Sequence, residues 1–195
     1  MYQFKDTDRI FIYTGPEGAG RRTVADRAGE TFSMKKVVAY TTRTRRPNET
    51  EGVDYFYLNP AQFKRAELNN EFVETIFSTT NLYGIKGADI EEHLSTHGAV
   101  YLIMNREGAE ILKGIYGDKV VRIFVYSDVD TVKKRQVEKG LSEESIARNI
   151  VKYNEDMAYM PLCEHAFENY DLSHTLFSLT KILEGYLKRD LLDLD

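Results

Sequence analysis

The chain has 195 residues, of which 42% are hydrophobic and 29% charged, and these values favour one globular domain with a substantial core over two large domains. Its net charge of −5 argues against a nucleic-acid binder held by a broad basic surface, and its single cysteine, Cys163, excludes an intramolecular disulfide. No cleavable signal and no apolar run near 18 residues is visible. We therefore expect a cytoplasmic protein that contacts no membrane.

The first apolar run, Arg9–Thr14, predicts a buried strand, and residues 15–23 follow it with the sequence GPEGAGRRT. We expect a helix to begin near Thr23. A strand, a glycine-rich loop and a helix in this order form the context of a phosphate-binding loop, in which backbone N–H groups turn inward. The pattern G-x-x-x-x-G-K-[ST] fits at both glycines and fails at Arg21, where lysine is expected. Phosphate binding is predicted, while catalytic competence stays open.

Strands and helices alternate along much of the remaining chain, which predicts an α/β fold with a mostly parallel sheet covered on both faces. The further strand candidates are Val37–Thr41, Ala99–Met104, Val120–Tyr126 and His165–Glu168. The helix candidates are Arg106–Tyr116, Val129–Lys139, Glu143–Leu162 and Ser173–Lys188, the last with Ser173 as a candidate N-cap.

One region departs from this alternation. Asp54–Asn59 and Glu71–Ser78 resemble antiparallel strands, with a helix at Ala61–Leu68 between them. We expect a small α+β insertion at residues 43–87, beside a core of residues 1–42 and 88–195 in a single domain spanning 1–195. A short lid is expected at about residues 136–160.

Five cations and no acid lie between Lys35 and Arg46. This basic segment suits a small anionic ligand, and a solvated surface face is the plainer interpretation.

Four short motifs follow the glycine loop in a fixed order. They are TTRTRRP at 41–47, EGVDY at 51–55, NEFVE at 70–74 and LYG at 82–84. With the loop, they resemble the guanylate kinase family, and the resemblance covers the chain from about Arg9 to Leu187. It implies a P-loop sheet, a GMP-binding insertion and a mobile lid. It also implies a role in purine nucleotide metabolism, in which the γ-phosphoryl of ATP passes to GMP with Mg²⁺.

The resemblance assigns roles on the acceptor side. Arg43 and Arg46 should grip the monophosphate, because a guanidinium fork holds phosphate oxygens in two directions. Tyr55 and Tyr83 should donate their hydroxyls to the same phosphate. Glu74 should accept hydrogen bonds from N1–H and the exocyclic amine of guanine, which adenine cannot offer. The plainer alternatives are half-buried strand aromatics for the tyrosines and a solvent-facing strand residue for Glu74.

The resemblance also implies residues on the donor side. Those expected around the ATP phosphates are Gly15, Gly18, Ala19, Gly20, Arg21, Arg22 and Thr23. The Thr23 hydroxyl is also the weak candidate for a contact with Mg²⁺. The implied catalytic arginines are Arg21, Arg43, Arg135 and Arg148.

Several positions depart from the family pattern around the nucleotides. Arg22 stands where glycine or serine is usual. Ile103 and Asn105 stand where the family usually carries two aspartates, although Asn105 can still accept one hydrogen bond from guanine. Ile85 replaces an expected hydroxyl contact to the base.

The expected lid also differs from the family pattern. Lys139 and Asn149 occupy positions of family arginines, and Arg135 matches a third. Arg148 precedes Asn149 by one residue, which rotates its side chain by roughly 100° on a helix. Arg148 can therefore replace the family arginine at position 149 only if the helix is rotated about its axis. The basic face around Arg135 also has a plainer interpretation, as a solvated helix surface.

Three functions stay open on these residues. The first is a guanylate kinase, including a slow one. The second is a catalytically impaired binding or regulatory protein that uses the GMP site for a nucleotide or a phosphopeptide. The third is a kinase with a changed acceptor, since Ile85 and Asn105 alter the base pocket. The departures gather on the ATP and metal side, whereas the acceptor-phosphate residues are intact.

Overall fold

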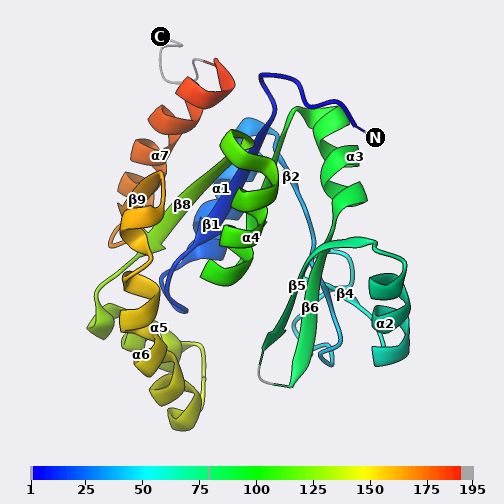
Figure 1. Cartoon of the computed structure of the whole chain (residues 1–195). Coiled ribbons are helices and arrows are strands. Elements are labelled where there is room, and N and C mark those ends of the chain that lie inside the picture. The colour runs from blue at the N-terminus through cyan, green and yellow to red at the C-terminus, as the bar shows by residue number, and fades with distance from the viewer. Residues whose placement is uncertain (1, 79, 190–195) are drawn as a thin grey trace.

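A computed structural model describes residues 2–78 and 80–189 of the chain. The ends of the expected 1–195 domain, residue 1 and residues 190–195, lie outside the described residues. Two sheets organise the molecule, one of five strands and one of four (Figure 1).

The five-stranded sheet is parallel throughout, which confirms the predicted α/β core. In spatial order its strands are β2 (Lys35–Lys36), β7 (Ala99–Ile103), β1 (Arg9–Thr14), β8 (Val120–Tyr126) and β9 (His165–Glu168). The central position of β1 places the glycine loop that follows it at the middle of the carboxyl edge. In open parallel sheets ligands bind at this edge.

Helices cover both faces of this sheet, and an apolar cluster lies on each side. One cluster contains residues of α1 (Arg21–Phe32) and α7 (Leu172–Leu187), and the other contains residues of α3 (Gly87–His97) and α4 (Arg106–Tyr116). Beyond one end of the sheet, α5 and α6 form an arm (Figure 1). The remaining helices are α5 (Val129–Glu138), α6 (Glu143–Met157) and the 3₁₀ turns η1 (Gly117–Lys119) and η2 (Met160–Leu162).

The four-stranded sheet takes three of its strands from residues 43–87, the expected insertion, and one from residues 40–41, just before it. Its strands in spatial order are β4 (Phe56–Tyr57), β3 (Tyr40–Thr41), β6 (Asn81–Lys86) and β5 (Phe72–Ser78). Helix α2 (Pro60–Leu68) packs on it through Phe63, whose ring stacks on Phe72 at 4.5 Å between centroids. Asn59 begins this helix with a capping box shared with Gln62.

The structure corrects several expected elements. Of the strand predicted at Val37–Thr41, only Tyr40–Thr41 is a strand, β3; β2 ends before it at Lys36, and the chain passes between the two from one sheet to the other. The expected antiparallel pairing of Asp54–Asn59 with Glu71–Ser78 is wrong. Strand β4 instead pairs in parallel with β3, and β5 pairs with β6. Strand β6, which contains the LYG motif, and helix α3 are not among the predicted elements.

Two helix starts also differ from expectation. Helix α1 begins at Arg21 rather than near Thr23, with Gly20 in the left-handed conformation as its N-cap. Helix α7 is capped by Asp171, whose carboxylate accepts the His174 N–H at 2.8 Å, and Ser173 lies inside its first turn. Among the described residues, no helix has the length and apolar character needed to cross a bilayer.

Candidate active site

The loop after β1 needs its glycines for geometric reasons. Gly15 has φ 129°, and a Cβ built on it would lie 2.1 Å from the Val125 carbonyl oxygen of the neighbouring strand β8. Gly20 has φ 91°, and its Cβ would lie 2.4 Å from Nδ2 of Asn169. No L side chain fits either position without movement of the backbone. The loop is therefore held tightly against the carboxyl edge of the sheet.

Side chains from distant segments hold the carbonyl groups of this loop. The Ala19 carbonyl accepts hydrogen bonds from Asn169 Nδ2 at 2.8 Å and Arg135 Nη1 at 3.3 Å. The Glu17 carbonyl accepts one from Gln136 Nε2 at 2.9 Å. These bonds, with that of the Ala19 N–H to the Pro16 carbonyl at 3.3 Å, fix the backbone of a glycine-rich loop, the kind of loop whose other N–H groups bind anions. The N-terminus of α1 adds partial positive charge there. The loop is thus suited to bind an anion.

Arg21, in the position of the expected lysine, folds back onto the loop. It donates to the Met104 carbonyl at the end of β7 at 3.2 Å and to the Glu17 carboxylate at 2.9 Å. Ile103, which replaces a family aspartate, packs against the apolar core and offers no polar partner there. Glu17 instead supplies the carboxylate that neutralises the cation. A polyphosphate would therefore compete with Glu17 for the Arg21 guanidinium.

Arg22 and Thr23 diverge after the loop. The Arg22 guanidinium turns toward the insertion and pairs with Asp54 at 2.6 Å. Thr23 is exposed in the first turn of α1. Mg²⁺ prefers oxygen ligands and commonly takes one or two carboxylates besides phosphates and water. With Ile103 apolar, the strand end offers no carboxylate, and Thr23 offers a hydroxyl. These residues suit an ion that arrives already bound to ATP.

Three of the four predicted acceptor-phosphate residues, all but Arg46, come together in the insertion. The guanidinium carbon of Arg43 lies 5.3 Å from the Tyr55 ring centroid, and the rings of Tyr55 and Tyr83 are 5.9 Å apart. Both tyrosines are half-buried strand or turn aromatics, so the plainer interpretation describes their packing. Their clustering around a guanidinium matches the implied phosphate grip.

Glu49 organises this cluster, and no sequence argument identified it. Its carboxylate accepts from Arg43 Nη2 at 2.6 Å and Nη1 at 3.0 Å, from the Tyr57 hydroxyl at 2.8 Å and from the Arg46 N–H at 2.8 Å. These donors, Arg43 first, lower the pKa of Glu49 to about 2. The Arg46 side chain is exposed. Glu49 therefore holds the segment that carries both predicted arginines and stays ionised near neutral pH.

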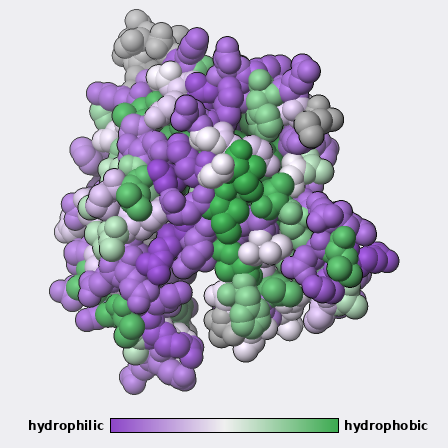
Figure 2. Space-filling model, in the orientation of Figure 1, coloured by the Kyte–Doolittle hydropathy of each residue, from purple (hydrophilic) through white to green (hydrophobic). Residues whose placement is uncertain are grey.

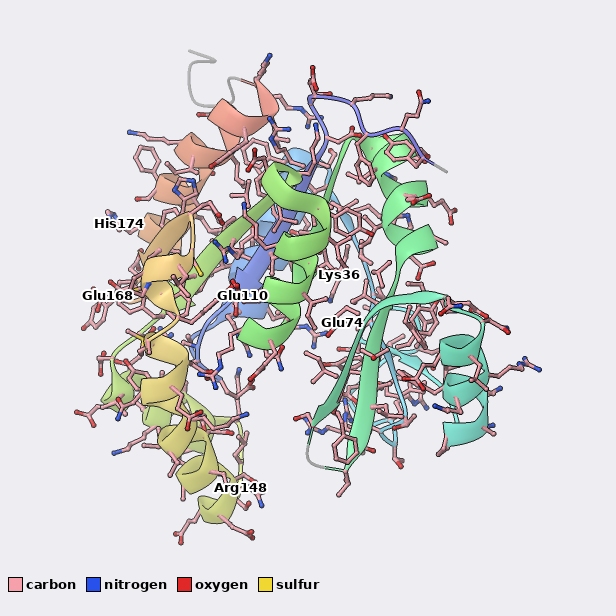
Figure 3. All side chains as sticks on the ribbon, in the orientation of Figure 1. Lys36, Glu74, Glu110, Arg148, Glu168 and His174 are labelled. Carbon is pink, nitrogen blue, oxygen red and sulfur yellow. The ribbon has the colours of Figure 1, made fainter. Side chains whose placement is uncertain are left out.

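Glu74 is buried, so the solvent-facing interpretation is wrong. The residue is 5% exposed, and burial raises its pKa to about 7. A shift in strand register between Phe72 and Glu74 turns the strand locally, as a β-bulge does. A Cβ built on Gly108 of α4 would lie 3.0 Å from Glu74 Oε1, which places the carboxyl between the insertion and the core. Figure 3 shows Glu74 on the side of β5 that faces α4.

Two neighbours of Glu74 define the rest of the expected base pocket. Asn105 is the N-cap of α4, and its Oδ1 accepts the Gly108 N–H at 3.0 Å. The acceptor expected to serve guanine is therefore engaged in capping, and the Nδ2 donors are the groups left for a ligand. Ile85 is the β6 partner of Glu74 in the register and is buried. The pocket at this point has an apolar wall.

The lid residues separate into two groups. Arg135 points inward, donating to Ser127 Oγ at 2.9 Å and to the Asn169 carbonyl at 2.8 Å, in addition to Ala19. Asn149 donates to the buried Gln136 at 3.0 Å. Arg148 is exposed, pairs with Glu144 in its own helix and lies on the outer part of the arm (Figure 3). In this conformation the structure brings Arg135 to the phosphate loop and leaves Arg148 away from it.

The donor and acceptor sides face each other. Figure 2 shows the surface notched between the arm of α5 and α6 and the lobe that contains the second sheet. Burial raises the pKa of Tyr55, on which the charges of Arg43, Arg22 and Glu17 also act. The pKa of Tyr55, in the insertion, thus depends on Arg22 of α1 and on Glu17 of the phosphate loop. The 2.6 Å contact of Arg22 with Asp54 shows directly that the first turn of α1 lies beside the segment that carries Tyr55.

Sequence reasoning missed three residues that shape this site, namely Glu49, Gln136 and Asn169. Asn169 follows β9 directly, and a polar residue at the carboxyl end of a parallel strand is a recognisable signal. Gln136 lies within a charged helix and gives no such signal. Glu49 lies in a loop six residues after Arg43, its ion-pair partner, and this spacing gives no signal in the sequence.

Comparison with known proteins gives one family. Residues 7–186 match the family model described as guanylate kinase. A guanylate kinase of Novosphingobium aromaticivorans is 31% identical over 177 residues, which cover 89% of this chain and 80% of that protein. One of Bacteroides fragilis is 26% identical, covering 93% and 91%. The crystal structure of guanylate kinase from Anaplasma phagocytophilum superposes with a TM-score of 0.77 at 22% identity, covering 96% of this chain and 90% of that one.

Proposed function

Because the chain belongs to the guanylate kinase family and is a nucleoside monophosphate kinase, we propose that it transfers the γ-phosphoryl group of ATP to GMP, forming ADP and GDP. The observation that carries this proposal is the arrangement in the insertion. Arg43, Tyr55 and Tyr83 cluster in the same lobe as a buried carboxyl, Glu74, to which no described residue donates a hydrogen bond.

The acceptor side supplies orientation and selectivity. The Arg43 guanidinium and the two tyrosine hydroxyls hold the GMP phosphate. The ionised Glu74 accepts N1–H and the exocyclic amine of guanine. Adenine offers no such pair of donors, so AMP would leave the Glu74 carboxylate buried and unpaired. An unpaired buried polar group is costly, and for that reason such sites discriminate strongly.

The donor side supplies charge neutralisation, which is most of what phosphoryl transfer requires of a protein. Mg²⁺, brought in with ATP, would supply further charge neutralisation, and the Thr23 hydroxyl is the group of this loop that could contact it. The loop N–H groups and the N-terminus of α1 bind the phosphates. Arg21 exchanges the Glu17 carboxylate for a phosphate oxygen and stays close through the Met104 carbonyl. Arg135 keeps the loop in shape.

A steady-state assay of ADP release with ATP, Mg²⁺ and GMP tests this function, with AMP, dGMP and UMP as alternative acceptors. We expect release that depends on GMP, with little for AMP or UMP. Equal rates with GMP and AMP would indicate a changed acceptor. No turnover with any acceptor would contradict the proposal.

A second function is favoured by specific observations on the donor side and in the base pocket. The apolar Ile103, the engaged Oδ1 of Asn105 and the exposed Arg148 are all unfavourable for catalysis. A binding or regulatory protein would keep the phosphate grip of the insertion for a nucleotide or a phosphopeptide. In that case GMP would stabilise the protein thermally without turnover and would compete with a phosphopeptide for one site. Independent simultaneous binding of both would exclude this alternative.

Arg21→Lys tests whether the altered loop is functional. If Arg21 is a working substitute, we expect kcat to change by less than about tenfold, because a positive charge is kept near the phosphates. The measurement is kcat with saturating GMP and varied ATP. Arg27→Lys, on an exposed turn of the same helix, is the control. A gain far above tenfold would identify Arg21 as a defect of this loop.

A further inference from the structure

Arg22 stands at a position where small residues are usual in the family, and its guanidinium lies near two carboxylates. It leaves the first turn of α1 and crosses to the insertion, where its Nη2 lies 2.6 Å from Asp54 Oδ1. The same guanidinium has its Nε 3.9 Å from Asp26 Oδ2, one turn further along α1. Arg22 therefore connects the helix of the phosphate loop directly to the acceptor lobe.

The core side of this connection is well anchored. Asp26 accepts a hydrogen bond from the Tyr101 hydroxyl of β7 at 2.9 Å, and Lys36 of β2 lies 3.7 Å from its Oδ1. The Lys36 side chain is largely buried, and it lies in the part of the core that faces the insertion (Figure 3). Two cations and two carboxylates thus alternate from the central sheet to the insertion.

The insertion side is anchored as well. Asp54 Oδ2 accepts the Thr50 N–H at 2.7 Å, and the Asp54 N–H bonds to the Thr50 carbonyl at 3.0 Å. Burial of Asp54 acts to raise its pKa, but the Thr50 N–H and the Arg22 guanidinium outweigh it, and the pKa is lowered. Asp54 stays ionised at neutral pH. It immediately precedes Tyr55, so a fixed Asp54 also fixes the start of the tyrosine that faces the acceptor phosphate.

We propose that Arg22 is a positioning residue that ties the acceptor lobe to the phosphate loop through Asp54, and thereby sets the separation of the two phosphates. This inference rests on the proposed phosphoryl transfer. The residues that grip GMP, including Arg43, Tyr55 and Glu74, belong to the insertion and move with it. Loss of the Arg22–Asp54 pair should leave GMP affinity nearly unchanged and lower the rate of transfer.

The kinetic test uses Arg22→Gln, Asp54→Asn and the double variant, with Arg27→Gln as the matched control. Arg27 pairs with Glu30 on the same helix and contacts neither phosphate site. We expect each single variant to lower kcat by about 10- to 100-fold, since a displacement near 1 Å has effects of that size. The Kd for GMP should change less than threefold. The double variant should be no slower than either single variant, and Arg22→Lys should recover part of the rate.

Additive losses in the double variant, or a rate loss in Arg22→Gln alone, would overturn the proposal. In the second case Arg22 would act on a phosphate directly.

A wild-type protein without turnover would contradict the proposed phosphoryl transfer and would leave the Arg22–Asp54 connection to a second measurement. That measurement is amide hydrogen exchange of residues 50–58, which reports on the Arg22–Asp54 connection independently of turnover. Exchange there should accelerate several-fold in Arg22→Gln and Asp54→Asn and stay unchanged in Arg27→Gln. Unchanged exchange in all three variants would refute the connection itself.

Discussion

Arg43→Ala should lower GMP-dependent turnover by about 10³-fold or more, the scale on which a guanidinium that stabilises phosphoryl transfer acts. Arg43 is the cation against which Tyr55 is packed, at 5.3 Å from the ring centroid, and its guanidinium is held in place by Glu49. Removing it takes away the fork and leaves the Glu49 carboxylate facing the acceptor phosphate. Both changes weaken binding of GMP and its orientation. Steady-state kinetics with varied GMP would measure the loss.

Arg45→Ala is the matched control, because Arg45 is an exposed cation of the same segment. Its kinetics should be those of the wild type. The double variant Arg43→Ala/Glu49→Ala separates the two causes of the loss. If it is as inactive as Arg43→Ala, the lost guanidinium is responsible. Full activity in this double variant would show that Arg43 only neutralises Glu49, and unchanged activity in Arg43→Ala would remove Arg43 from the site.

Glu74→Gln should abolish the preference for GMP over AMP, a change of about 10² or more in the ratio of kcat/KM. The ionised carboxylate accepts both guanine donors, whereas an amide can accept with its oxygen and would oppose the second donor with its own N–H₂ group. Measured kcat/KM for GMP and AMP gives the ratio. Glu71→Gln is the control, since Glu71 is exposed and pairs with Lys86 nearby. A Glu74→Gln protein that still discriminates would contradict the assignment.

The raised pKa of Glu74 adds a dependence on pH. Because only the ionised form accepts both donors, kcat/KM for GMP should rise with pH through about 7, and this rise should be absent in Glu74→Gln. Burial favours the neutral acid in the folded state, so ionising Glu74 destabilises the fold as pH rises from the usual value of 4.5 to about 7. Above pH 7, Glu74→Gln should be more stable than the wild type by up to about 3 kcal/mol. Equal stability at pH 8 would contradict this.

The parts of the fold that follow from short-range patterns were predictable. Alternating strands and helices predicted the parallel core. The glycines predicted the phosphate-binding loop, and Gly15 in that loop has no space for a Cβ. The change of sheet between β2 and β3, across residues 37–39, was not predictable, because a run of apolar residues does not show where a chain changes sheets. Nothing in the LYG motif distinguished a strand from a binding loop, and β6 was missed for that reason.

The candidate site shows the same division. Arg43, Tyr55, Tyr83 and Glu74 were identified from motifs, and the structure brings the first three together. The direction taken by each charged side chain was beyond the sequence. Arg22 was expected at the ATP phosphates, and it reaches Asp54, 32 positions away in the chain, because folding brings this carboxylate within range. Charge pairs between distant segments depend on the packed geometry, which local patterns do not contain.

The central claim is that this chain transfers phosphate to GMP with an arginine in place of the loop lysine. A single-turnover reaction tests it most directly, with protein in excess over GMP, ATP labelled at the γ-phosphorus, Mg²⁺ present and the labelled nucleotides separated over time. The account predicts labelled GDP at the expense of ATP, with no labelled ADP when AMP replaces GMP. GMP that binds and is never labelled, even over hours, would contradict the account and leave a nucleotide-binding protein on a kinase fold.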